Sequence, residues 1–190
     1  MRVIRYAELK AQPWLNGGGN TRVLDADAPG SDFGWRISIA SIDQAGPFSA
    51  LPGIDRVITL IEGEFLLLDV DGAEHGLEKY RPFRFSGDSA VSGEPVGSST
   101  DLNVMTRRGA FQGFTTVLEL SKKRPHPVFP GQWAVLLQGA ATVSVPGPDG
   151  SAGEPVALAR YDAVVGHGEQ APELSGRGFV AIISIDPAQT

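Results

Sequence analysis

Arginine provides most of the positive charge that could hold a ligand in this chain. Twelve of the 16 basic residues are arginines. A guanidinium presents a planar fork of donors that matches a carboxylate, and it stays charged at physiological pH. Four arginines lie in separate extended segments: Arg22, Arg36, Arg56 and Arg107. Two of them meeting in one barrel would select a dicarboxylate, whereas the alternative is that each pairs with Asp or Glu on a solvated face.

Amides and hydroxyls accompany these arginines and extend the predicted ligand-binding set by Asn16, Thr21, Ser38 and Asn103. The Asn103 amide can both donate to and accept from a bound acyl or formyl group. Asp101 is expected to orient an arginine, because its negative charge would repel an anionic ligand.

Three consecutive glycines in "PWLNGGGNTR" (13–22) raise the question of a phosphate-binding loop. The P-loop pattern is absent, and the third glycine of a dinucleotide fingerprint would fall at Arg22. Gly17, Gly18 and Gly19 are therefore predicted to form a tight bend where only glycine fits. They would also provide a bare-backbone rim whose N–H groups face an anion.

Catalytic and metal chemistry find little support in the residue types. The chain has no cysteine, and His75, His126 and His167 lie far apart in turn-rich segments. Three-histidine metal sites need imidazoles that converge from strands, so no metal or other cofactor is expected. The G-x-S-x-G nucleophile motif is also absent. General-base catalysis by Glu62 or Asp55 remains as an alternative if either carboxylate is buried.

The overall charge limits the class of partner. The formal net charge is −6, which disfavours nucleic acid or an anionic membrane as the main partner. The first residues are charged throughout, and no apolar run approaches the roughly 18 residues of a membrane span. A cytoplasmic location is the expectation.

Short alternating segments dominate the chain and predict strands. In "WRISIASI" (35–42), Arg36 and Ser38 share one face, and in "DLNVMTRR" (101–108) Asp101, Asn103 and Met105 share one face. Dense Gly and Pro mark turns between the apolar runs, and no segment of helical length has a 3.6-residue pattern. The prediction is an all-β chain with very little helix.

An internal repeat indicates two similar halves. Residues 132–150 repeat the layout of residues 55–72, with an apolar strand, a polar residue followed by Gly, a second apolar strand and an Asp-Gly turn. We therefore expect two jelly-roll barrels in one chain, with an N-terminal half at 1–120 and a C-terminal half at 121–190. Exchange of strands between the halves is left open.

Four ordered segments resemble one family. "WLNGGGNTR", "WRISIASI", "GPFSALPGIDRVITLIEG" and "DLNVMTRR" are similar to blocks of the HutD/Ves family of bicupin proteins, in the cupin superfamily. The resemblance implies a pocket in the N-terminal half and a small carboxylate ligand such as formylglutamate or formate. It also implies a role in limiting expression of the histidine-utilisation pathway.

The sequence therefore favours a non-enzymatic regulator that binds a small carboxylate metabolite. A metal-free cupin enzyme acting on a small acyl acid is the first alternative. A structural or interaction module with a vestigial pocket is the second. A homodimer formed through a free strand edge is compatible with each.

Overall fold

The prediction of an all-β chain with very little helix is confirmed. The computed structural model describes residues 1–147, 151 and 153–188. In this part of the chain the one helical element is the 3₁₀ turn η1 (Tyr6–Glu8). No described helix is long and apolar enough to cross a membrane.

The chain divides into two compact units. The larger unit comprises Lys10–Phe114 and Ile185–Thr190, and the smaller unit comprises Met1–Leu9 and Thr115–Ser184. The predicted boundary between residues 120 and 121 stays a prediction. The smaller unit is discontinuous in sequence, because its first strand comes from the N-terminus.

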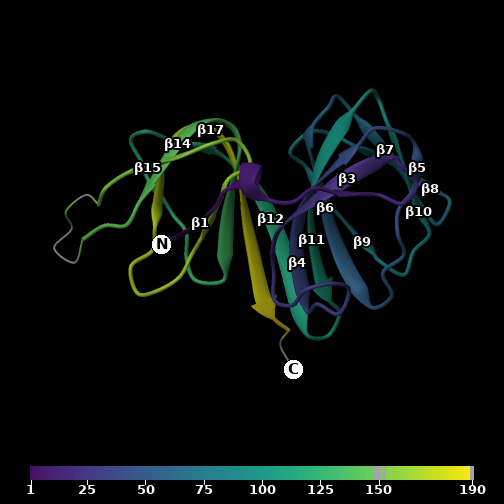
Figure 1. Cartoon of the computed structure of the whole chain (residues 1–190), viewed down its shortest axis with the longest axis horizontal. Helices are drawn as coiled ribbons and strands as arrows, with labels where there is room; N and C mark the ends of the chain where they lie inside the picture. The colour runs from purple at the N-terminus through teal and green to yellow at the C-terminus, as the bar shows by residue number, and fades with distance from the viewer. Residues whose placement is uncertain (148–150, 152, 189–190) are drawn as a thin grey trace. The chain divides into compact units, whose positions relative to one another are not determined.

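The larger unit contains two antiparallel sheets. Its six-stranded sheet has the order β2 (Gln12–Pro13), β3 (Gly19–Ala26), β4 (Trp35–Ile42), β11 (Ser99–Arg107), β6 (Ile54–Glu62) and β9 (Pro82–Ser86). Its four-stranded sheet has the order β5 (Gly46–Pro47), β10 (Val91–Pro95), β7 (Leu66–Val70) and β8 (Ala73–Leu77). Strands β4, β11, β6 and β9 can be followed side by side in Figure 1.

Turn residues send the chain from one sheet to the other. Gly63, with φ of +103°, follows β6 and precedes β7 in the four-stranded sheet. Asp71 and Gly72 then form the tight β7–β8 turn, with φ of +55° and +84°. This is the positive-φ geometry that an Asp-Gly hairpin turn requires. The Asp-Gly signal read from the sequence thus marks a real hairpin.

Apolar side chains from both sheets form the core of the larger unit. On the six-stranded sheet, Ile58 and Leu60 are fully buried, and on the four-stranded sheet so are Leu66 and Leu68. Arg56 lies two residues before Ile58 on the same face of β6, because side chains alternate along a strand. An arginine therefore occupies a position where an apolar residue would extend the core.

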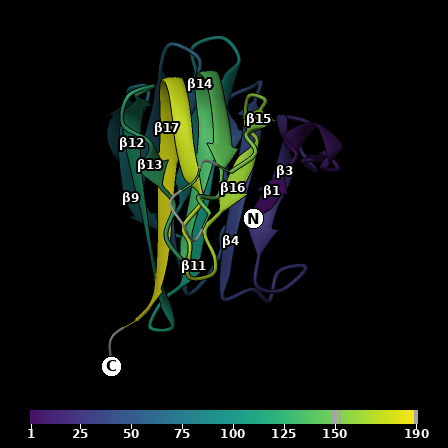
Figure 2. The same cartoon turned by 90° about the vertical axis from the view of Figure 1, so that its left-hand side faces the viewer.

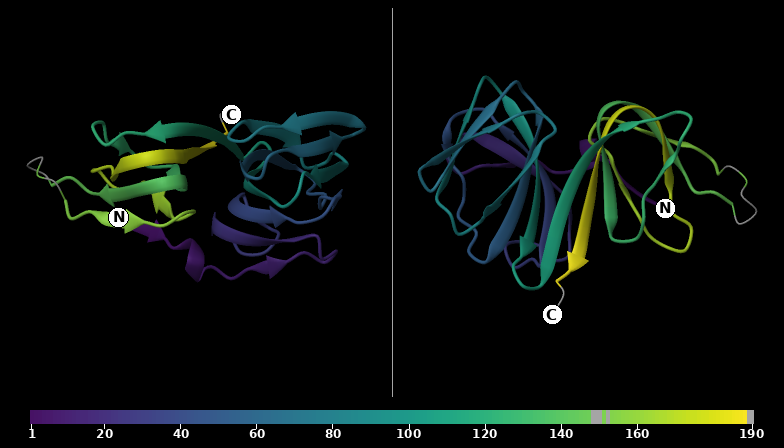
Figure 3. Two further views of the ribbon diagram at one scale, coloured as in Figure 1. Left: turned by 90° about the horizontal axis from the view of Figure 1, so that it is seen from above. Right: turned by 180° about the vertical axis from the view of Figure 1, so that it is seen from behind.

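The smaller unit is built on a seven-stranded sheet. Its order is β1 (Arg2–Ile4), β16 (Ala163–Val165), β14 (Gln132–Ser144), β17 (Glu173–Pro187) and β12 (Phe111–Leu120), with β15 (Val156–Leu158) on β14 and β13 (His126–Pro127) on β17. Figure 2 shows β16, β14 and β17 as neighbours, and Figure 3 shows β17 (yellow) beside β12. Its buried cluster includes Leu136, Val143 and Val164.

One detail of the predicted repeat differs from the structure. We expected residues 132–150 to form two strands separated at Gln138 and Gly139, but β14 is continuous from Gln132 to Ser144. The break appears only as a register shift against β17 between Leu136 and Gln138, with Gly139 at φ of +98°. A polar residue followed by glycine is typical of a turn between strands, but it is equally compatible with a bulge inside one continuous strand. The Asp-Gly turn at 149–150 lies outside the described residues.

Candidate functional site

A cavity of about 500 Å³ opens in the larger unit, against one face of the six-stranded sheet. Strands β3, β4, β6 and β11 supply its floor, and the segments around β2 and β5 supply its rim. It is lined by Pro13, Trp14, Leu15, Asn16, Thr21, Arg36, Ser38, Ala40, Pro47, Phe48, Ser49, Leu51, Arg56, Asp101, Asn103 and Met105.

Strand register brings the polar floor together. Residues opposite one another on neighbouring antiparallel strands share a face. The rows of the floor are Arg36–Met105–Arg56, Ser38–Asn103 and Thr21–Ala40–Asp101. Two arginines from strands that are not adjacent in the sheet therefore flank the same methionine.

Arg56, Asn103 and Asp101 form a buried chain of hydrogen bonds. Arg56 Nη2 donates to Asn103 Oδ1 over 2.8 Å, and Asn103 Nδ2 donates to Asp101 Oδ1. Their exposed fractions are 6%, 3% and 1%, so all three are almost completely out of solvent. The Asn103 side-chain amide thus bridges the two charged groups, and its carbonyl oxygen accepts from Arg56 without any ligand.

Burial shifts the titration of both charged groups. Burial raises the pKa of Asp101 to about 7, although the charge of Arg56 and the bond from Asn103 act in the opposite direction. Burial also lowers the pKa of Arg56 to about 10, with Asp101 raising it and Arg36 lowering it. At neutral pH Arg56 is thus charged, whereas Asp101 lies close to its midpoint.

Arg36 places a second guanidinium in the cavity. Its Nη2 lies 3.2 Å from Met105 Sδ, a weak acceptor, and its guanidinium carbon lies 4.4 Å from the centroid of the Phe33 ring. Burial lowers the pKa of Arg36 as well. Within the described residues, the buried Nε atoms of Arg36 and Arg56 have no hydrogen-bond partner.

Aromatic and apolar side chains form the rim. Trp14 packs edge-on against Phe48, with ring centroids 6.2 Å apart, and its Nε1 donates to Thr21 Oγ1 over 2.8 Å. Phe48 also lies 5.3 Å from the guanidinium carbon of Arg56. Leu15 is fully exposed at the mouth of the cavity. A ligand would therefore meet cations at the floor and apolar surface at the entrance.

The glycine triplet shapes the rim through its backbone. Gly17 has φ of +69°, and a Cβ on Gly19 would lie 2.0 Å from the Ser41 carbonyl oxygen, so both positions require glycine. However, Gly17 N–H donates to Trp14 O, and Gly18 N–H donates to Asn16 Oδ1. These two donors are used inside the loop, and none of the three glycines lines the cavity.

The structure brings together six residues of the predicted ligand-binding set and separates the others. The six that line the cavity are Asn16, Thr21, Arg36, Ser38, Arg56 and Asn103. Arg22 pairs with Ile39, whereas its neighbour Thr21 lines the cavity, so Arg22 lies on the opposite face of the sheet. Arg107 bonds Asp32 and the Phe33 carbonyl at the end of β11. Neither of these two arginines lines the cavity.

Several lining residues were outside the predicted set. Met105 shares the alternating face of Asp101 and Asn103, so its position could have been read from the sequence. Phe48 comes from the segment that follows β5, where no periodicity signals which way a side chain points.

The two carboxylates considered as general bases, Asp55 and Glu62, lie outside the cavity. Asp55 accepts a bond from Arg108. Among the described residues, no cluster of three or more His, Cys, Asp or Glu side chains could hold a metal ion. The arrangement suits the binding of an anion, with one carboxyl group able to exchange a proton.

Solved structures share this fold over the whole chain. A conserved protein of unknown function from Pseudomonas aeruginosa PAO1 aligns with a TM-score of 0.83 and 29% identity, covering 97% of this chain and 98% of its own. HutD from Pseudomonas fluorescens SBW25, in a structure described as a formate condition, aligns with a TM-score of 0.79 and 28% identity, covering 99% of each chain. A cupin 2 conserved barrel domain protein from Leptotrichia buccalis aligns with a TM-score of 0.59 at 12% identity, which shows the fold alone.

Sequence relatives align with part of the chain. Protein Ves of Citrobacter koseri is 45% identical over 112 residues, which is 55% of this chain and 59% of that protein. Protein Ves of Cronobacter sakazakii is 40% identical over 111 residues, 55% of this chain and 61% of that protein. The chain thus spans about three fifths of these relatives' length. The model of the HutD family matches residues 6–182, and the chain therefore belongs to the HutD family.

Proposed function

We propose that this chain is a non-enzymatic regulator that binds a small carboxylate in the cavity of the larger unit. The observation that carries the proposal is the pair Arg36 and Arg56, each with a buried Nε that lacks a partner among the described residues. A buried donor without an acceptor costs about 1–3 kcal/mol. A carboxylate that reaches the two guanidiniums would accept charge-assisted hydrogen bonds from them.

The site is also electrostatically prepared for an anion. Arg36 and Arg56 carry two positive charges, and Asp101 carries less than one full negative charge near pH 7. The net positive charge attracts a carboxylate into a pocket of low polarity, where the attraction is stronger than in water.

Family membership suggests which acid and which process. By analogy with HutD, the ligand would be formylglutamate or formate, and binding would modulate histidine utilisation. The Pseudomonas fluorescens HutD structure was obtained in a formate condition, which is consistent with a small carboxylate. The acidic balance of this chain favours action on a metabolite or a protein partner in the cytoplasm over contact with DNA.

The proposal extends to the architecture. Two jelly-roll barrels in one chain would account for the two compact units, each with its own buried cluster. The hydrogen-bonded strand order of each sheet is an open path with two ends, so closure of either barrel remains part of the proposal.

Calorimetry with formate, formylglutamate, urocanate and glutamate tests the ligand. Arg56→Gln and Arg36→Gln should each weaken binding at least tenfold, because each removes a charge-assisted contact worth about 1.5–3 kcal/mol. Arg81→Gln is the matched control, since Arg81 is an exposed arginine paired with Glu78 outside the cavity. The proposal fails if no acid binds at millimolar concentration, or if the three variants behave alike.

A second function has one observation in its favour. The pKa of Asp101, raised to about 7 by burial, would suit a general acid or base in a metal-free reaction of a small acyl acid. Turnover of formylglutamate by metal-stripped protein, lost in Asp101→Asn, would establish this function. Tight binding of formylglutamate without turnover would support the non-enzymatic regulator over the enzyme.

A further inference from the structure

A second hollow, of about 580 Å³, lies in the smaller unit. Its lining is Glu119, Leu120, Ser121, Lys122, Lys123 and Arg177, and all six belong to this unit. We call it the basic hollow. It shares no lining residue with the cavity of the larger unit.

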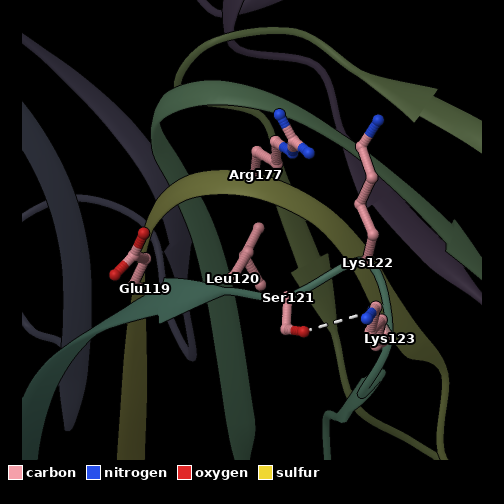
Figure 4. A pocket seen from close by; sticks show the side chains of 6 residues that line it. All are labelled: Glu119, Leu120, Ser121, Lys122, Lys123 and Arg177. Carbon is pink, nitrogen blue, oxygen red and sulfur yellow. Dashed lines mark hydrogen bonds between the residues drawn. The ribbon is translucent and has the colours of Figure 1, made fainter.

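The strand order explains why a hollow forms here. β12 ends at Leu120 and β13 begins at His126, and both strands pair with β17. The connection between them leaves the sheet, and Lys123 N–H donates to Ser121 Oγ to hold a local turn. Arg177, on β17, lies across from this connection (Figure 4).

The basic hollow concentrates positive charge on an acidic chain. Lys122, Lys123 and Arg177 contribute three cations against the single carboxylate of Glu119, whereas the whole chain carries −6. Figure 4 shows Lys122 and Arg177 extending to the same side, with Glu119 at the far end of the hollow. A local field of opposite sign to the whole chain indicates a surface for a negatively charged group.

None of these three cations is held in an ion pair within the described residues. All three are exposed and long enough to reach one. Other exposed arginines do form pairs, including Arg81 with Glu78 and Arg108 with Asp55 and Asp88. The three cations are therefore available to an external anion.

The lining indicates what kind of anion fits. No aromatic side chain lines the basic hollow, so it offers no platform on which a nucleic-acid base could stack. A long polyanion would also meet the repulsion of a chain with net charge −6. A short segment with a few carboxylates meets only the local cations, and flexible Lys and Arg side chains can adjust to it.

We propose that the basic hollow is a docking site for an acidic, Asp- and Glu-rich segment of a partner protein. The segment lies across the β12–β13 connection, with its carboxylates paired to Lys122 and Arg177. The basic hollow shares no residue with the cavity of the larger unit, so the test of this proposal is independent of the test of the proposed function.

Fluorescence anisotropy of a labelled acidic peptide, titrated with the full chain at low ionic strength, tests the proposal. The double variant Lys122→Gln/Arg177→Gln should bind about five- to twentyfold more weakly, because each exposed ion pair contributes a modest factor. Lys10→Gln/Lys79→Gln removes the same charge from exposed lysines of the larger unit and should keep wild-type affinity. Added salt should weaken wild-type binding, since exposed charges are screened.

Three results would overturn the proposal. The first is an absence of peptide binding at millimolar concentration, with the fold verified by circular dichroism. The second is an equal loss in the two double variants, which would show a general effect of net charge. The third is competition in which inorganic pyrophosphate or a short single-stranded DNA displaces the peptide at far lower concentration, which would assign the hollow to a phosphate ligand.

Discussion

Replacing Asp101 with Asn should remove a pH dependence from ligand binding. Asp101 is buried in the cavity, and its pKa is raised to about 7, so near neutral pH it is divided between the charged and neutral forms. A carboxylate ligand held by Arg36 and Arg56 would be repelled by the ionised form only. Binding should therefore draw a proton onto Asp101, and affinity should fall as pH rises through 7.

The size of the effect follows from Coulomb's law. At a separation of about 7 Å and an effective dielectric constant of about 20, two unit charges repel by about 2.4 kcal/mol. That energy raises the pKa of Asp101 by about 1.7 units in the complex. Two-state linkage then gives an affinity about 20-fold higher at about pH 6 than at about pH 8.5. Arg56, with a pKa of about 10, remains mostly charged over this range.

Titration calorimetry with formate and formylglutamate measures the pH dependence of affinity directly, because the carboxylates of these two acids stay ionised between about pH 6 and about pH 8.5. Repeating each titration in buffers of different ionisation enthalpy gives the number of protons taken up. In Asp101→Asn the Asn103 amide keeps an acceptor, and the affinity should be flat with pH. A flat wild-type profile, or a slope that survives in Asp101→Asn, would refute the reasoning.

Three further outcomes are expected. Asp101→Asn should also raise Tm by several degrees at about pH 8, because the folded variant no longer buries a carboxylate whose pKa is raised. Below about pH 4 this gain in Tm should vanish, because Asp101 of the wild type is then protonated in both the folded and the unfolded state. Gly19→Ala should cost about 2–3 kcal/mol in urea unfolding because its Cβ would meet the Ser41 carbonyl oxygen, whereas Gly46→Ala has only ordinary contacts and should be near neutral; equal costs would contradict this. Asp162→Asn should cost about 3 kcal/mol, since this 2% exposed carboxylate bonds the Arg5 guanidinium and a backbone N–H of the N-terminal segment; a loss below about 1 kcal/mol would show that the pair contributes little.

The floor of the cavity could be predicted because strand alternation is a local property. Arg36 and Ser38 on one strand, and Asp101 and Asn103 on another, were assigned to shared faces by counting alone. The structure places all four in the cavity. Antiparallel register then brings the two faces together, and the prediction needed no long-range information beyond a common sheet.

Loops and strand ends could not be predicted in the same way. The donors of Gly17 and Gly18 are used by their own loop, which depends on how the chain bends between Trp14 and Gly19. Alternation along β11 would place Arg107 on the same face as Met105. However, Arg107 lies at the last position of β11, and its guanidinium bonds Asp32. Burial of Asp101, which raises its pKa, depends on residues distant in the sequence and has no signature in the neighbouring sequence.

The pairing of β1 with β16 has a consequence for how the chain is made. Arg2 pairs with Val165, so the strand β1 waits for a partner that is translated more than 150 residues later. Residues 10–114 of the larger unit leave the ribosome long before that, and they can collapse first. A fragment that begins after Leu9, or one that stops before residue 163, would leave the β1–β16 ladder of the smaller unit unmade. The β1–β16 ladder should therefore form later than the larger unit's strands between residues 10 and 107.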